Sequence, residues 1–183
     1  MDQRTRSTIG IVPIEELASA PGLELLRGII DGRYPIPPIA ELLGFQLTEV
    51  DFGRAVFQGT PEFKHYNPLG MVHGGYAATL LDSCMGCSVH STLPVGVGYT
   101  TLEFKITLIR AITDETGIVT AEGRILNSGR RAATAEGRLT DAKGGCWPME
   151  RRPVWCSTFR SVPNHPPRAV KRRAECPPDS GKP

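Results

Sequence analysis

The spacing of hydrophobic residues predicts two helical segments of different character. Over residues 14–31, apolar side chains recur every three to four positions, and Pro21-Gly22 predicts a break within this helix. Residues 73–91 are instead apolar on nearly every side. A helix without a polar face is typical of a buried position, so we expect this second helix at the centre of the fold.

A period of two marks the predicted strands. Hydrophobic and polar residues alternate over the segments 45–50, 54–62, 99–109, 117–126 and 131–140. Such alternation favours an antiparallel sheet with one buried face, and the short links that contain Gly or Asn suit hairpins. We therefore predict an α+β fold in which a curved antiparallel sheet wraps around one long central helix.

Composition divides the chain into three parts. Residues 1–34 hold an N-terminal tail and helix, and residues 35–143 hold the predicted helix-and-sheet domain. Over residues 144–183 proline and arginine become frequent and the alternation mostly stops, which predicts a divergent, disordered tail. Within that tail, Val154–Phe159 could supply one substitute strand, because valine, tryptophan and phenylalanine favour strands.

Charge and composition argue against several functional classes. The net charge of +2 is too small to predict a nucleic-acid partner, and no apolar run reaches the roughly 20 residues that cross a membrane. The polar first ten residues lack a signal-peptide core, which predicts a cytoplasmic protein with free thiols. Cys84 and Cys87 form a CxxC pair, but no second pair follows at a suitable spacing, so we predict helix packing and no metal site.

The sequence His73-Gly74-Gly75 opens the central helix, and Asp82 follows nine residues after the histidine. A helix N-terminus presents free backbone N–H groups and the positive end of the dipole, which suits a developing oxyanion. A carboxylate in an apolar helix is costly and is typical of groups kept for chemistry. The combination predicts acyl transfer to water. The structural alternative is that Asp82 bonds a neighbouring loop and that His73 only caps the helix.

The segment from about Leu43 to Lys143 resembles the hotdog-fold acyl-CoA thioesterases. Asn67 lies six residues before His73, and the strand Tyr99–Ile106 follows the helix, as in that family and above all in its PaaI-type branch of phenylacetate degradation. The resemblance implies a hotdog fold, a long helix wrapped by an antiparallel sheet. It also implies hydrolysis of acyl-CoA to free acid and coenzyme A, with no cofactor beyond the coenzyme A of the substrate.

The resemblance implies roles for five residues in the helix and in the loop before it. Asp82 would act as general base or nucleophile, and Asn67 would position the attacking water or the thioester. A backbone N–H at Gly74 or Gly75 would polarise the carbonyl, and His73 would shape the helix entrance.

Further residues follow from the same resemblance. Thr101 would assist the water, with Thr100 as an adjacent candidate because the loop length is uncertain. Arg130 and Arg131 would meet the phosphates of coenzyme A, although solvated hairpin residues are an equal alternative. The residues that could line a pocket for an aromatic or medium aliphatic acyl group are Tyr76, Leu80 or Phe104.

Gly74 and Asp82 lie too far apart along the helix to act on one carbonyl. The eight residues of helix between them span about 12 Å. We therefore predict a homo-oligomer, a two-fold dimer or a tetramer built from such dimers, in which the oxyanion donor of one chain faces the carboxylate of the other.

The sequence after Gly144 departs from the family pattern. Family members continue into a last strand similar to LLAHGTTTCLVF, whereas this chain reads GCWPMERRPVWCSTF from Gly145 to Phe159. One choice of codons for this segment encodes the family strand when the reading frame moves by two bases. We therefore hypothesise a frameshift, with a divergent tail as the alternative. Loss of an interior strand would leave backbone groups unpaired and would weaken folding and activity.

Three other functions stay open at the level of sequence. The first is a non-catalytic acyl-CoA-binding protein of the same fold, or a thioesterase relative that folds poorly; an assay of coenzyme A ester hydrolysis distinguishes these from an enzyme. An enoyl-thioester hydratase would need an Asp and a His about five residues apart in one loop, which the sequence lacks. A zinc module at Cys84 and Cys87 would be tested by metal analysis.

Overall fold

The computed structural model describes residues 8–129, 131–142 and 157–163, the last of these as backbone only. Its longest helix, α4, runs over Gly74–His90. Three shorter helices precede the sheet: α1 (Ile14–Leu17), α2 (Gly22–Ile30) and α3 (Pro38–Leu43). Two single-turn 3₁₀ helices, Phe63–His65 and Asp114–Thr116, lie in the loops before α4 and β4.

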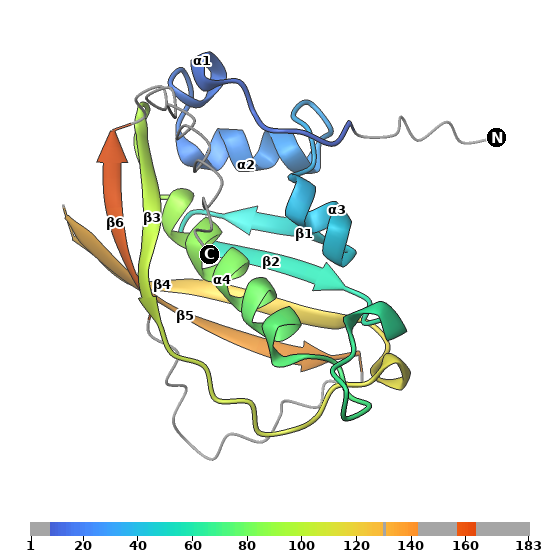
Figure 1. Cartoon of the computed structure of the whole chain (residues 1–183). Helices are drawn as coiled ribbons and strands as arrows, with labels where there is room; N and C mark the ends of the chain where they lie inside the picture. The colour runs from blue at the N-terminus through green and yellow to red at the C-terminus, as the bar shows by residue number, and fades with distance from the viewer. Residues whose placement is uncertain (1–7, 130, 143–156, 164–183) are drawn as a thin grey trace, which may run out of the picture.

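Six strands form a single antiparallel sheet in the order β1-β2-β4-β5-β6-β3. The sheet curves around α4, which lies within its concave side (Figure 1). This arrangement confirms the predicted fold of a long helix wrapped by an antiparallel sheet. The strands are β1 (Phe45–Asp51), β2 (Arg54–Gly59), β3 (Val97–Phe104), β4 (Val119–Ser128), β5 (Ala132–Asp141) and β6 (Ser157–Pro163).

The core lies between α4 and the inner face of the sheet. Leu80 and Cys84 of α4 are fully buried, as are Val119 and Ala121 of β4 and Ala135 of β5. Most sides of the helix therefore contact other parts of the protein, which explains why its sequence lacks a clear polar face.

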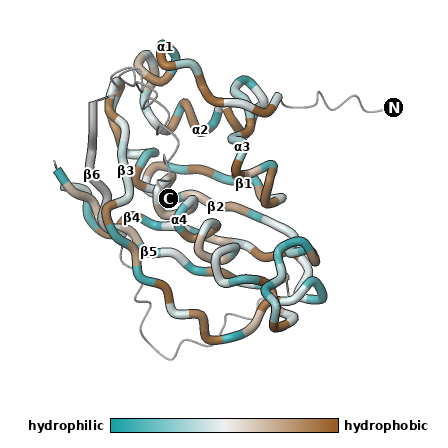
Figure 2. The backbone as a smooth tube through the Cα atoms, in the orientation of Figure 1, coloured by the Kyte–Doolittle hydropathy of each residue, from teal (hydrophilic) through white to brown (hydrophobic). Residues whose placement is uncertain are grey.

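The N-terminal segment packs against the same core. As predicted, the helix over residues 14–31 breaks at Pro21-Gly22, which separates α1 from α2. The Gly22 N–H donates to the carbonyl of Leu93 (3.1 Å), and a side chain at Gly22 would overlap the carbonyl oxygen of His90. Hydrophobic residues prevail in α2 (Figure 2), and its buried face rests on β1 and α4.

The strand expected over residues 99–109 is shorter in the structure. It ends at Phe104, which pairs with Ser157, the first residue of β6. Residues 105–113 continue as irregular chain. Alternating sequence alone does not make a strand, because a strand also needs a backbone partner.

The strand β6 lies inside the sheet, between β5 and β3. It overlaps the substitute strand expected over Val154–Phe159 but is displaced toward the C-terminus. Seven residues of the tail therefore form regular structure. The rest of the tail, including the point of the hypothesised frameshift, lies outside the described residues. Within the described part of the chain, no helix has the length and hydrophobicity needed to cross a membrane.

Candidate active site

The first turn of α4 has one backbone donor that is unused. His73 is the N-cap, and its Nδ1 accepts a hydrogen bond from the Gly75 N–H (2.9 Å). The His73 N–H donates to the carbonyl of His65 (2.7 Å), which fixes the approach to the helix. No described residue accepts a hydrogen bond from the Gly74 N–H. Gly74, rather than Gly75, therefore offers the donor for an oxyanion at the positive end of the helix dipole.

A cavity of about 340 Å³ lies beside this donor. Gly74, His73 and Asn67 line it, together with Leu108 and Arg110. The side-chain oxygen of Asn67 accepts hydrogen bonds from the backbone N–H groups of residues 69 and 71, at 2.9 and 3.3 Å. Asn67 thus organises the loop before α4, and its amide oxygen is already engaged.

Asp82 lies two turns further along α4 and is half-buried. Its Oδ1 accepts a hydrogen bond from the Thr101 hydroxyl of β3 (3.0 Å). Thr100, the neighbouring candidate, is exposed on the other side of the strand. The structure therefore brings Thr101, and not Thr100, to the carboxylate.

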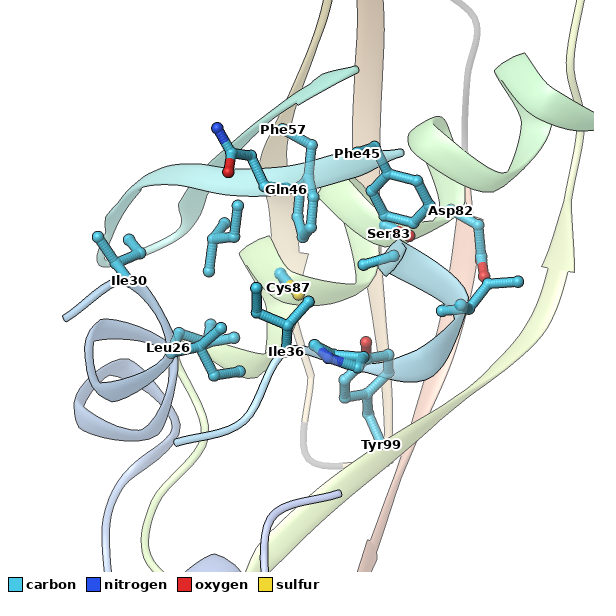
Figure 3. A pocket seen from close by; sticks show the side chains of 15 residues that line it. Leu26, Ile30, Ile36, Phe45, Gln46, Phe57, Asp82, Ser83, Cys87 and Tyr99 are labelled. Atoms are coloured by element: carbon cyan, nitrogen blue, oxygen red, sulfur yellow. The ribbon is translucent and has the colours of Figure 1, made fainter. Parts of the chain in front are cut away.

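Asp82 lines a second cavity, of about 290 Å³. Figure 3 shows Asp82 and Ser83 at one end of this cavity and Cys87 further along the same helix face. Apart from Asp82, none of the described lining residues is charged. None of the three expected acyl-pocket residues lines this cavity: Tyr76 and Leu80 are in the core, and Phe104 is exposed.

The two cysteines of the CxxC pair are held as neutral thiols. Burial raises the pKa of Cys87 to about 12, against the opposing effect of a hydrogen bond with Tyr99, and the Asp82 charge raises it further. Burial also raises the pKa of Cys84 well above its usual value. Thiol reactivity requires thiolate, so burial makes both cysteines unreactive in this fold.

The predicted site residues thus separate into two groups on one chain. Asn67, His73 and Gly74 share the first cavity, whereas Asp82 and Thr101 belong with the second. The two cavities have no lining residue in common. Eight residues of helix separate Gly74 from Asp82, about 12 Å along the axis. The Asp82 group and the Gly74 group of one chain, called half-sites below, therefore border different cavities.

Of the two arginines expected to meet coenzyme A, Arg131 is exposed immediately before β5, and Arg130 lies outside the described residues. Sequence reasoning missed Arg110, which lines the cavity beside Gly74 and pairs with Asp141 (3.6 Å). It also missed Ser83 beside Asp82; its only signal was its place next to the acid on the helix.

Known proteins support the same fold. Residues 69–147 match the model of the thioesterase superfamily, and no curated protein matches the chain. A conserved protein from Pseudomonas aeruginosa is 28% identical, with a TM-score of 0.57, over 69% of this chain and 95% of that protein. A phenylacetic acid degradation-related protein from Ralstonia eutropha is 23% identical, with a TM-score of 0.59, over 74% of this chain and 97% of that protein.

A thioesterase family protein from Silicibacter pomeroyi is 18% identical to the chain, with a TM-score of 0.62, over 75% of this chain and 98% of that protein. These structural likenesses concern the fold, while the sequence match covers the start of α4 and Asp82. The chain therefore has a hotdog fold, and its residues 69–147 are similar to the thioesterase superfamily.

Proposed function

We propose that the protein hydrolyses acyl-CoA thioesters in a cleft shared by two copies of the chain. The observation that supports this proposal is the division of the site residues. A carboxylate held by Thr101 borders one cavity, and a free N–H at Gly74 borders the other. A two-fold axis that places one cavity against the other would complete two equivalent sites.

The chemistry follows from these groups. Asp82 takes a proton from water while the water oxygen attacks the thioester carbonyl carbon. The carbonyl electron pair moves onto oxygen, and the Gly74 N–H from the second chain donates to this oxyanion. Collapse of the intermediate breaks the C–S bond, and the leaving thiolate takes the proton from Asp82. The products are the free acid and coenzyme A.

The edge of the sheet offers a surface for this pairing. Within the described sheet, β3 is an edge strand with one side of its backbone unpaired. Four large apolar side chains on β3 and the segment after it are 40–54% exposed: Leu102, Phe104, Leu108 and Ile109. An exposed apolar edge is typical of an interface, and this one continues to the Gly74 cavity through Leu108.

Recognition of coenzyme A requires cations near the cleft. Arg110 borders the cavity of Gly74, and its side chain is 57% exposed in spite of its pairing with Asp141. Arg131 stays a second candidate because it is exposed. Guanidinium groups suit the phosphates of coenzyme A since they bind phosphate oxygens in pairs.

The direct test is Asp82→Asn, assayed by release of coenzyme A from acyl-CoA esters. We expect kcat to fall by about 10²–10⁴-fold, the usual contribution of a general base, while circular dichroism stays unchanged. Asp31→Asn, which alters an exposed acid at the end of α2, is the matched control and should retain wild-type turnover. Full turnover by Asp82→Asn would refute the role of Asp82. Binding of acyl-CoA by the wild-type protein without turnover would instead identify a non-catalytic binding protein.

A further inference from the structure

The cavity beside Asp82 extends away from the carboxylate toward the N-terminal helices. We propose that α2 and the segment up to α3 form the wall of an acyl-chain pocket that selects uncharged, apolar acyl groups of about 8–12 carbons. This inference rests on the proposed function, since it assigns the substrate class of the same site.

The geometry of the cavity carries the first step. Asp82 and Ser83 lie at one end, and Leu26 and Ile30 of α2 lie at the other, with Cys87 between them (Figure 3). From Asp82 to Cys87 the helix advances by about 7.5 Å. An acyl group with its carbonyl at Asp82 would therefore run along α4 toward α2.

The chemistry of the lining gives the second step. Away from Asp82 the lining is mostly aliphatic and aromatic, with the neutral amide of Gln46, and among the described lining residues the only charge is the Asp82 carboxylate at the near end. A carboxylate or ammonium group at the end of the acyl chain would be desolvated there without a partner. The apolar side chains away from Asp82 include Leu26, Ile30, Ile36 and Phe57, whereas Phe45 lies beside Ser83 at the near end (Figure 3).

The volume of the cavity sets the length of the acyl group. A cavity of about 150 Å³ lined by apolar side chains holds one benzene, which has six carbons. At about 290 Å³, this cavity has room for roughly twice as many. Burial of each methylene should raise kcat/KM about fourfold until the cavity is full. Longer chains should then gain nothing, because the added methylenes would pass Ile30, which is partly exposed, and stay in water.

The test compares acyl-CoA esters of 4, 10 and 16 carbons in the full-length protein. Ile30→Trp adds bulk at the far end, where Ile30 is already 39% exposed, so the fold should tolerate it. We expect the ratio of kcat/KM for the 10-carbon over the 4-carbon ester to fall at least tenfold. Leu26→Ala enlarges the same end and should move the optimum toward 16 carbons. Leu42→Trp is the control, since Leu42 is 68% exposed and does not line the cavity; its ratio should equal that of the wild type.

A second measurement keeps the two proposals distinguishable. Stabilisation against heat by the 10-carbon ester, relative to coenzyme A alone, reports binding without turnover. We expect Ile30→Trp to lose this difference. An unchanged chain-length profile in both α2 variants, with hydrolysis intact, would overturn the assigned wall and leave the proposed function standing. If no ester is hydrolysed, the proposed function fails. In that case, loss of 10-carbon ester binding in Ile30→Trp would still support the pocket, and unchanged binding of this ester would refute the pocket.

Discussion

The imidazole of His73 accepts a hydrogen bond from only one of the two glycines that follow it. Its Nδ1 engages the N–H of Gly75 and leaves the N–H of Gly74 without an acceptor among the described residues. Gly74 occupies the first helical position, where a backbone N–H has no partner within the helix. A single capping contact therefore selects which donor can reach a substrate oxygen.

Gly74 permits a substitution that removes only this donor. Proline is favoured at the first helical position and has no N–H, so Gly74→Pro should preserve the helix. We expect kcat to fall by about 10²–10³-fold, as for the loss of one oxyanion donor. Gly74→Ala is the matched control: its Cβ meets the same Leu108 methyl, 2.9 Å away, but its N–H is kept. Equal activities for the two variants would exclude this N–H from catalysis.

The sequence indicates the residues of the candidate site but not all of their contacts. The spacing of Gly74 and Asp82 follows from helix geometry alone, so their separation was predictable. The choice of Gly74 over Gly75 depends on the side-chain conformation of His73, and the choice of Thr101 depends on how β3 lies against α4. Neither arrangement is encoded in local periodicity.

His90, at the end of α4, predicts a pH dependence of stability. Its Nδ1 is buried with no hydrogen-bond partner among the described residues, and burial lowers its pKa below 6.5. The unfolded chain therefore binds more protons as the pH falls through 6.5, and the free energy of unfolding should decrease below that pH. His90→Phe keeps a ring beside Tyr99 and should flatten this slope in urea denaturation between pH 7 and 5. An unchanged slope would assign the effect to other groups.

At the scale of the elements, the helix and the sheet meet backbone to backbone at β4. A Cβ at Gly123 would overlap the carbonyl of Cys84 in α4, so only glycine lets the strand approach this closely. The existence of the central helix and the strands was predictable from hydrophobic spacing. The end of β3 at Phe104 was not, because it is set by where β6 begins.

Alanine substitutions at Gly123 and Gly137 compare a contact with helix backbone to a contact with a helix side chain. Gly123→Ala would press on helix backbone, which cannot move aside, and should lower the free energy of unfolding by about 3 kcal/mol or more. Gly137→Ala meets the side chain of Met85, with its Cγ at 3.0 Å, and that chain is flexible. Its cost should be about 1 kcal/mol. Urea denaturation would measure both, and similar costs would contradict rigid contact at Gly123.

At the scale of the whole molecule, the two half-sites predict complementation between inactive chains. In a mixed dimer of Asp82→Asn and Gly74→Pro chains, one cleft would hold both intact groups and the other neither. Random pairing should restore roughly a quarter of the active sites. The measurement is hydrolysis by co-expressed, separately tagged chains, with each variant alone as control. No recovery in an isolated mixed dimer would show that each chain holds its own complete site.

The position of β6 bears on the order in which the chain can fold. β6 is the last described strand to be synthesised, yet it separates β3 from β5. While the chain is still on the ribosome, β1, β2, β4 and β5 can already pair, but β3 has no neighbour until the final segment emerges. A nascent chain stalled before residue 157 would therefore expose the backbone edge of both β5 and β3, and chaperones or aggregation would compete for these edges.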